Sequence, residues 1–266
     1  MMTMTNVFRF LMAAAGLMGA AAAQTPQASA PVRIILVGDS TMAPKSGYGS
    51  GFCALVTAQV TCLNMAKGGR STSSYRAEGS WTQVMDELKR NADFHATYVL
   101  IQFGHNDQPG KPGRSTDLAT EFPANLRRYV EEVKSAGAKA MLVTPLTRRS
   151  FRDGQLQDSL GPWADAARKV AEEEGVPLLE LHADSGAAVQ KMGPVEADTL
   201  AMAPPPPGVT EAAQTGTTIA APKAPAGSDA PVFDYTHLGA KGAAFFGRMV
   251  ADELVTAVPE LHGYFR

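Results

Sequence analysis

Two patterns of apolar and polar residues alternate along this chain: short uninterrupted apolar runs and longer amphipathic stretches. The runs that indicate buried strands are 32–37, 60–64, 97–103, 138–144 and 176–181. The stretches that indicate helices are 48–59, 81–91, 121–136, 158–174 and 239–258. Strands that alternate with helices predict a parallel sheet with helices on both faces. We therefore expect an α/β fold, a three-layer α/β/α sandwich with a five-stranded parallel sheet of flavodoxin type.

One long segment, 193–231, lacks such a pattern. It contains four consecutive prolines at 204–207 and many alanine, threonine and glycine residues, with no apolar period. This composition predicts a mobile or polyproline-like insertion. A tolerated surface insertion is the simpler interpretation, and a lid that shapes a substrate cleft is the functional alternative.

The first 23 residues also differ from the rest of the chain. Arg9 precedes the apolar segment 10–20, and three alanines at 21–23 then precede Gln24. A positive start, a short apolar segment and a small-residue cleavage site are typical of a secretory signal peptide. We expect residues 1–23 to be removed and the mature protein to be secreted or periplasmic, without membrane attachment. A retained membrane anchor is the alternative.

Composition adds limits on size and partners. The chain has 266 residues, of which 45% are hydrophobic and 19% charged, which fits a single domain over residues 32–266. Its net charge of −2 argues against a nucleic-acid partner. The oligomeric state is left open.

Cys53 and Cys62 are the two cysteines of the chain. Two cysteines fit an oxidising compartment, in which a disulfide between them would close a short loop. A pair of buried free thiols explains the sequence equally well.

Ser40 is the candidate nucleophile. It lies just past the first apolar run, where open α/β sheets bind ligands. A serine hydroxyl needs a base within hydrogen-bonding distance, and His237 is the best candidate because Asp234 precedes it by three residues. Asp234 would orient the imidazole and stabilise its protonated form. Such pairs also occur at helix caps, so the inference depends on combining them with Ser40.

Acyl transfer also needs donors for the oxyanion of its tetrahedral intermediate. We assign the backbone N–H groups of Ser40 and Gly69 and the side-chain amide of Asn106. In isolation, the glycines at 68 and 69 would suggest an ordinary tight turn, and residues 105–107 would suggest the end of a strand.

This set of residues resembles the SGNH (GDSL) hydrolase superfamily, because Ser40, Gly69, Asn106 and His237 match the four residues for which the superfamily is named. The resemblance runs from the first strand to the last helix, apart from residues 193–231. The sequence is similar in particular to the rhamnogalacturonan acetylesterase branch in the segments 39–43, 64–71, 78–81, 103–107 and 144–149. Thr41 replaces the leucine of the common superfamily motif, and the insertion departs from the compactness of the branch.

The resemblance implies removal of acetyl groups from pectic polysaccharide without a metal or other cofactor. Rhamnogalacturonan carries carboxylates, and arginines bind carboxylates bidentately. We expect Arg70 and Arg148 to be substrate-binding residues, with Arg70 favoured because it follows an oxyanion donor. Arg76 and Arg149 are further candidates, and solvated surface arginines are the simpler interpretation of all four.

The expected function is that of a secreted or periplasmic serine esterase acting on an acetylated plant-wall polysaccharide or oligosaccharide. Pectin and xylan both remain open as the polymer. A lipase- or thioesterase-type hydrolase is the alternative within the superfamily, and a non-catalytic carbohydrate-binding protein is the alternative outside the enzymes. The sequence has neither H-E-x-x-H nor a P-loop motif.

Overall fold

The computed structural model describes residues 31–221 and 231–266. Its main sheet has the strand order β2-β1-β3-β4-β7, and every neighbouring pair is parallel. The predicted five-stranded parallel sheet is confirmed. The strands are β1 Val32–Gly38, β2 Val60–Asn64, β3 Ala96–Gln102, β4 Lys139–Val143 and β7 Leu178–Leu179.

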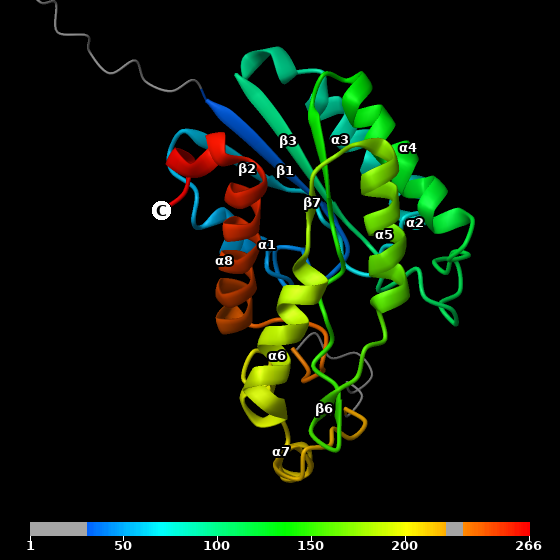
Figure 1. Cartoon of the computed structure of the whole chain (residues 1–266), viewed down its shortest axis with the longest axis vertical. Helices are drawn as coiled ribbons and strands as arrows, with labels where there is room; N and C mark the ends of the chain where they lie inside the picture. Colours follow the sequence, from blue (N-terminus) through cyan, green and yellow to red (C-terminus); the bar gives the residue numbers. More distant parts are fainter. Residues whose placement is uncertain (1–30, 222–230) are drawn as a thin grey trace, which may run out of the picture.

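Helices cover both faces of this sheet (Figure 1). The first half of the chain contributes α1 Gly49–Cys53, α2 Ser74–Ala77, α3 Ser80–Leu88, the 3-10 turn η1 Asn91–Asp93 and α4 Glu121–Ser135. The second half contributes α5 Gly161–Glu174, α6 Leu181–Asp198, α7 Pro207–Gln214, α8 Ala240–Ala257 and the 3-10 turn η2 Pro259–Tyr264. In Figure 1, α1 and α8 lie on one side of the sheet and α3, α4 and α5 lie on the other.

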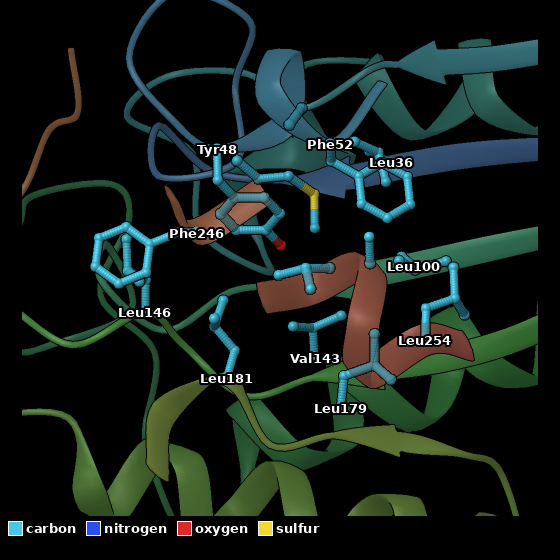
Figure 2. Packing of buried hydrophobic residues seen from close by; sticks show 14 of the residues in the cluster. Leu36, Tyr48, Phe52, Leu100, Val143, Leu146, Leu179, Leu181, Phe246 and Leu254 are labelled. Atoms are coloured by element: carbon cyan, nitrogen blue, oxygen red, sulfur yellow. The ribbon is translucent and has the colours of Figure 1, made fainter. Parts of the chain in front are cut away.

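Alternate residues of each central strand pack into two separate apolar layers. In β1, Ile34 and Leu36 point into one layer, whereas Ile35 and Val37 point into the other. The first layer packs against α1 and α8, whose Phe52 and Phe246 are buried. Figure 2 shows both rings among the apolar side chains of this layer. Strands buried on both faces explain the uninterrupted apolar runs in the sequence.

The register of the sheet brings three loops together at one edge. Gly38, the last residue of β1, is paired with Gln102 at the end of β3, and Leu36 is paired with Asn64 at the end of β2. The segments that follow these three strands therefore leave the sheet as neighbours. Parallel sheets bind ligands at this carboxyl-terminal edge.

The helix predicted over 48–59 is wrong beyond Cys53, where α1 ends. The following residues pair with the end of the chain instead: Val56 forms a bridge with Phe265, and the N–H of Thr57 donates to the Tyr264 carbonyl at 2.9 Å. This tertiary pairing outweighs the local preference for helix. Cys53 and Cys62 form a disulfide, with their Cα atoms 5.6 Å apart.

The prediction that 193–231 lacks regular structure is wrong for its described part. The helix α6 continues past an irregular Gly193, and α7 follows from Pro207. Proline is compatible with the first turn of a helix, so the proline run delimits α7 instead of excluding it. Leu200 lies in the core, and Ala201 forms a bridge with Leu238. This part of the segment is therefore built into the fold, and residues 222–230 lie outside the described residues.

A short antiparallel hairpin, β5 Phe151–Arg152 and β6 Gln155–Leu156, was not predicted. Asp153 and Gly154 form its turn with φ angles of 51° and 76°. Positive φ at both positions is typical of a two-residue hairpin turn with an Asp-Gly sequence. The Asp-Gly pair at 153–154 is therefore a sequence signal from which this hairpin can be predicted.

The predicted signal peptide, residues 1–23, lies outside the described residues. Within the part of the chain that is described, no helix is both long and apolar enough to cross a membrane.

Candidate active site

Ser40 and His237 come from opposite ends of the chain and meet at the carboxyl edge of the sheet. The Ser40 Oγ and the His237 Nε2 lie 2.9 Å apart, within hydrogen-bonding distance. The other ring nitrogen, Nδ1, lies 2.6 Å from the Asp234 Oδ2. The structure thus brings together the three residues predicted for nucleophile, base and orienting acid. Ser40 is buried, with 8% of its surface exposed, and His237 is half-buried.

Asp234 is held as a carboxylate. Its burial acts to raise its pKa, but hydrogen bonds from the side chain and backbone of His237 and from the backbone of Thr236 outweigh this and lower the pKa to about 2. The two backbone N–H groups donate to Oδ1 at 2.6 and 2.7 Å, which leaves Oδ2 for the imidazole. An ionised Asp234 favours a proton on the Nδ1 of His237, so Nε2 faces Ser40 as the acceptor.

Arg149 fixes the loop that carries Asp234 and His237. Its guanidinium is fully buried and donates to the carbonyls of Asp234 at 2.8 Å and His237 at 3.0 Å. The backbone N–H of Arg149 donates to the Tyr235 carbonyl at 2.9 Å. Burial lowers the pKa of Arg149 to about 10, which leaves it charged at neutral pH. The prediction that Arg149 binds substrate is therefore wrong, because its side chain is used inside the protein.

A buried chain of hydrogen bonds supports the turn that presents Ser40. The Tyr48 hydroxyl donates to the Gln102 Oε1 at 2.6 Å, and the Gln102 Nε2 donates to the Thr41 Oγ1 at 2.7 Å. Thr41 in turn donates its hydroxyl and its N–H to the Asp39 Oδ1, both at 2.8 Å. A leucine at position 41 would remove two of these bonds, which gives the departure from the common motif a structural role.

The loop after β2 places Gly68 and Gly69 against the nucleophile. A Cβ atom at Gly68 would lie 3.8 Å from the Ser40 Cβ, in van der Waals contact. Gly69 has a φ of 77°, which L side chains rarely adopt. Among the described residues, neither the Ser40 N–H nor the Gly69 N–H donates a hydrogen bond. Both groups are free to bind an oxyanion.

Asn106 completes the predicted donor set. Its side chain is buried, and Nδ2 donates to the Arg70 carbonyl at 3.1 Å. An amide nitrogen carries two hydrogens, so this bond orients the group and leaves the second hydrogen for a ligand. The Asn106 side chain therefore adds a third potential donor to the two backbone N–H groups.

Asp107 joins the two loops that carry these donors, a role that the sequence did not reveal. Its buried carboxylate accepts from the Thr72 N–H at 3.0 Å and from the hydroxyls of Thr72 and Thr116 at 2.5 and 3.0 Å. Burial raises the pKa of Asp107 to about 6 despite these bonds. Asp107 thus helps to set the distance between the loop that carries Gly69 and the loop that carries Asn106, together with the bond from Asn106 to the Arg70 carbonyl.

His105, which directly precedes the donor Asn106, is buried beside Asp39. Its Nδ1 is 3.5 Å from the Asp39 Oδ2, and both side chains are buried. Burial lowers the pKa of His105. It does not contact Ser40 through any hydrogen bond of the described residues, so it is not a second base.

The two arginines predicted to bind substrate have different surroundings. Arg70 donates to one oxygen of Glu78 through Nε at 2.8 Å and Nη2 at 2.6 Å, and to the Gly68 carbonyl through Nη1 at 2.7 Å. These bonds hold the loop that carries Gly68 and Gly69, and they use the hydrogen-bond donors of the Arg70 guanidinium. Arg148 is half-buried and has only the Ser159 hydroxyl, 2.7 Å from Nη1, as a partner among the described residues. Its role in substrate binding stays a prediction.

Arg76, the fourth candidate arginine, belongs to α2, and its side chain packs against α3 and α4. Its Nη2 donates to Glu132 at 2.7 Å, and its guanidinium lies over the rings of Trp81 and Tyr129.

In residues 31–221 and 231–266, no group of three or more His, Cys, Asp or Glu side chains is arranged to hold a metal ion.

Comparisons with known proteins agree with this geometry. Residues 36–245 match the model of a family described as GDSL-like Lipase/Acylhydrolase. The rhamnogalacturonan acetylesterase RhgT of Bacillus subtilis is 34% identical over 178 residues, which cover 64% of this chain and 73% of RhgT. The probable rhamnogalacturonan acetylesterase YesY of the same organism is 26% identical over 225 residues, which cover 82% of this chain and 90% of YesY.

A solved structure shows the same fold. The crystal structure of the protein YxiM from Bacillus subtilis superposes with a TM-score of 0.65 at 22% identity. The superposition covers 88% of this chain and 58% of YxiM, so this chain spans little more than half the length of that protein.

Proposed function

The chain belongs to the GDSL-like lipase/acylhydrolase family, and from that premise we propose that it is a serine carbohydrate esterase that removes O-acetyl groups from rhamnogalacturonan. One observation carries the proposal: the hydrogen-bond chain from Ser40 through His237 to Asp234. The similarity to RhgT and YesY supports the choice of substrate.

In the first half of the reaction, the Ser40 Oγ attacks the carbonyl carbon of the acetyl ester. The His237 Nε2, 2.9 Å away, takes the hydroxyl proton, and Asp234 stabilises the imidazolium. Negative charge then develops on the former carbonyl oxygen, where the N–H groups of Ser40 and Gly69 and the amide of Asn106 stabilise it. The C–O bond to the sugar breaks, and the sugar oxygen leaves with the proton from His237.

Water completes the cycle. His237, neutral again, takes a proton from a water molecule as the water oxygen attacks the acetyl-Ser40 carbonyl. The second tetrahedral intermediate uses the same three donors. Its collapse breaks the bond to the Ser40 Oγ, returns the proton to that oxygen and releases acetate. The base must be neutral for both attacks, because a protonated imidazole cannot accept a further proton.

The location is part of the proposal. A secreted or periplasmic enzyme would meet plant-wall polysaccharide, and residues 1–23 have the pattern of a signal peptide. The disulfide between Cys53 and Cys62 supports an oxidising compartment.

Acetate release from a panel of acetylated polysaccharides tests the proposal. The panel contains rhamnogalacturonan, homogalacturonan and xylan, with p-nitrophenyl acetate and octanoate as small esters. We expect the highest kcat/KM on rhamnogalacturonan, and acetate preferred over octanoate. The Ser40→Ala variant should release no acetate above background. A preference for octanoate would favour the lipase-type alternative, and equal activity in Ser40→Ala would overturn the mechanism.

A further inference from the structure

Three cations near the site lack a carboxylate partner. Lys111, Arg114 and Arg148 form no salt bridge with any residue of the described part of the chain. Arg70 differs, because Glu78 lies 2.6 Å from its Nη2. All three unpaired side chains are half-buried, and none extends freely into solvent.

Two of these cations are carried by one closed loop, residues 108–115, which begins directly after Asn106 and Asp107. The Ser115 hydroxyl donates to the Gln108 carbonyl at 2.8 Å and accepts from the Lys111 N–H at 2.9 Å. The loop returns to the site where the Thr116 N–H donates to the Asp107 carbonyl at 2.9 Å. The position of the loop is thus fixed by its own hydrogen bonds and by Asp107.

The loop 108–115 lies between the segment that carries Gly69 and the side chain of Arg148. On one side, the Arg114 Nη1 is 3.3 Å from the Gly69 carbonyl oxygen. On the other side, the Gln108 Nε2 donates to the Ser159 carbonyl at 2.6 Å, and the Ser159 hydroxyl accepts from Arg148. Ser159 therefore holds the loop and Arg148 next to each other. The cluster therefore extends from the Gly69 carbonyl to Ser159.

The charges of the cluster act on one another. Burial lowers the pKa of Lys111, and the charges of Arg148 and Arg114 lower it further. Asp39 and Asp107 act in the opposite direction, each with a smaller effect than either arginine. Like charges held together by structure repel one another, and a bound anion would remove this repulsion.

We propose that Lys111, Arg114 and Arg148 form a carboxylate-binding subsite for a uronic acid residue of the substrate, placed beside the scissile acetyl ester. The proposal rests on the proposed function and refines it. An arginine fork recognises the two carboxylate oxygens, and a lysine adds a point charge. The sequence favoured Arg70 as the residue that binds the carboxylate. In this proposal Lys111, Arg114 and Arg148 bind it, whereas Arg70 holds the loop that carries Gly68 and Gly69.

Binding of an unreacted ligand tests this subsite independently of catalysis. The ligand is a deacetylated rhamnogalacturonan oligosaccharide, and its matched control is the same oligosaccharide with every carboxyl group reduced to an alcohol. Isothermal titration calorimetry on the whole protein measures both. We expect the charged ligand to bind about tenfold or more tightly than the reduced one, with affinity that falls as salt increases.

The variants Lys111→Met and Arg148→Met locate the effect. Each should weaken binding of the charged ligand about tenfold and leave that of the reduced ligand nearly unchanged. Lys169→Met on α5, which removes a cation 3.9 Å from Glu173, is the matched control and should bind like wild type.

Two results would overturn the proposal: equal affinity of wild type for both ligands, or a loss of affinity in Arg70→Met without one in Lys111→Met and Arg148→Met. The comparison of the two ligands in wild type needs no variant, so it decides the question even if a substitution impairs folding. Failure of the proposed function would instead appear as absent acetate release from acetylated rhamnogalacturonan by wild type.

Discussion

Two half-buried carboxyl groups of this molecule, those of Asp234 and Glu253, have pKa values shifted in opposite directions. Asp234, at the carboxyl edge of the sheet, accepts three hydrogen bonds and has a pKa lowered to about 2. Glu253 of α8 lacks such a set of donors: the Glu180 backbone N–H is the one donor that lowers its pKa, and the Asp184 side chain raises it. Burial, together with Asp184 and Glu180 at α6, raises the pKa of Glu253 to about 8.

The difference shows that hydrogen-bond donors, more than burial, decide which carboxyl stays charged. The Asp234 loop directs two backbone N–H groups at its carboxylate, whereas Glu253 faces other acids. Glu253 also lines a groove of about 880 Å³ whose other walls include the apolar side chains of Leu178 and Met249. The protein maintains a charge where the proposed chemistry needs one, and holds a proton where no reaction is expected.

The largest effect should come from removing the charge of Asp234. Asp234→Asn keeps the size of the side chain but favours the wrong imidazole tautomer, so kcat should fall about 10³- to 10⁴-fold. Initial rates on p-nitrophenyl acetate measure this. Glu253→Gln on α8 is the matched control, because Glu253 forms no hydrogen bond with Ser40, His237 or Asp234, and it should stay within about twofold of wild type. A similar loss in both variants would remove the functional distinction between the two carboxyls.

A smaller effect is expected from removing the side-chain amide of Asn106, the third predicted oxyanion donor. Asn106→Ala should lower kcat about 10²- to 10³-fold, with a lesser change in KM, because the interaction forms mainly in the transition state. Steady-state kinetics on the same ester separates the two constants. An unchanged kcat with a raised KM would mean that Asn106 binds substrate and not the oxyanion.

The smallest effect concerns the contribution of Glu253 to stability. Because its folded-state pKa is raised to about 8, the native state binds a proton that the unfolded chain has released, so Glu253 contributes stability at low pH. That contribution is lost as pH rises from about 5 to about 8. We expect a loss of about 1 kcal/mol at this solvent-screened site, or about 2–4 °C in Tm.

Glu253→Gln isolates this contribution. Thermal unfolding between pH 5 and pH 9 should show a flatter dependence of Tm on pH in the variant than in wild type. Asp234 cannot produce the same trend, because its lowered pKa makes its stabilising contribution disappear only in strong acid, as pH falls toward about 2. Parallel curves for the two proteins would show that Glu253 is ionised throughout this range.

Much of the fold follows from local pattern. The apolar runs predict the central strands because each of these strands is buried on both faces, and Ser40 is identifiable because it directly follows such a strand. The pairing of Asp234 with His237 is local in sequence, so it too could be inferred. The pattern predicts neither α6 nor α7: residues 181–192 show no clear apolar stripe, and beyond them proline suggests a break, whereas Pro194 follows the irregular Gly193 and Pro207 lies in a first helical turn.

The supporting contacts could not be inferred, because they join residues distant in sequence. Arg149 reaches the Asp234 loop across 85 positions, and Asp107 reaches Thr72 across 35. An arginine near a predicted cleft gives no local sign of whether it points inward or outward. For the same reason, the sequence favoured Arg70 as a ligand residue, although Glu78 occupies its guanidinium.

Covalent trapping of the nucleophile tests the central claim most directly. Phenylmethanesulfonyl fluoride reacts with activated serine hydroxyls, and intact-mass measurement with peptide mapping locates the adduct. The account predicts one adduct per chain, on Ser40, with esterase activity lost in proportion, and no adduct in His237→Ala. Complete loss of activity with Ser40 unmodified, or full modification of Ser40 with activity retained, would contradict it.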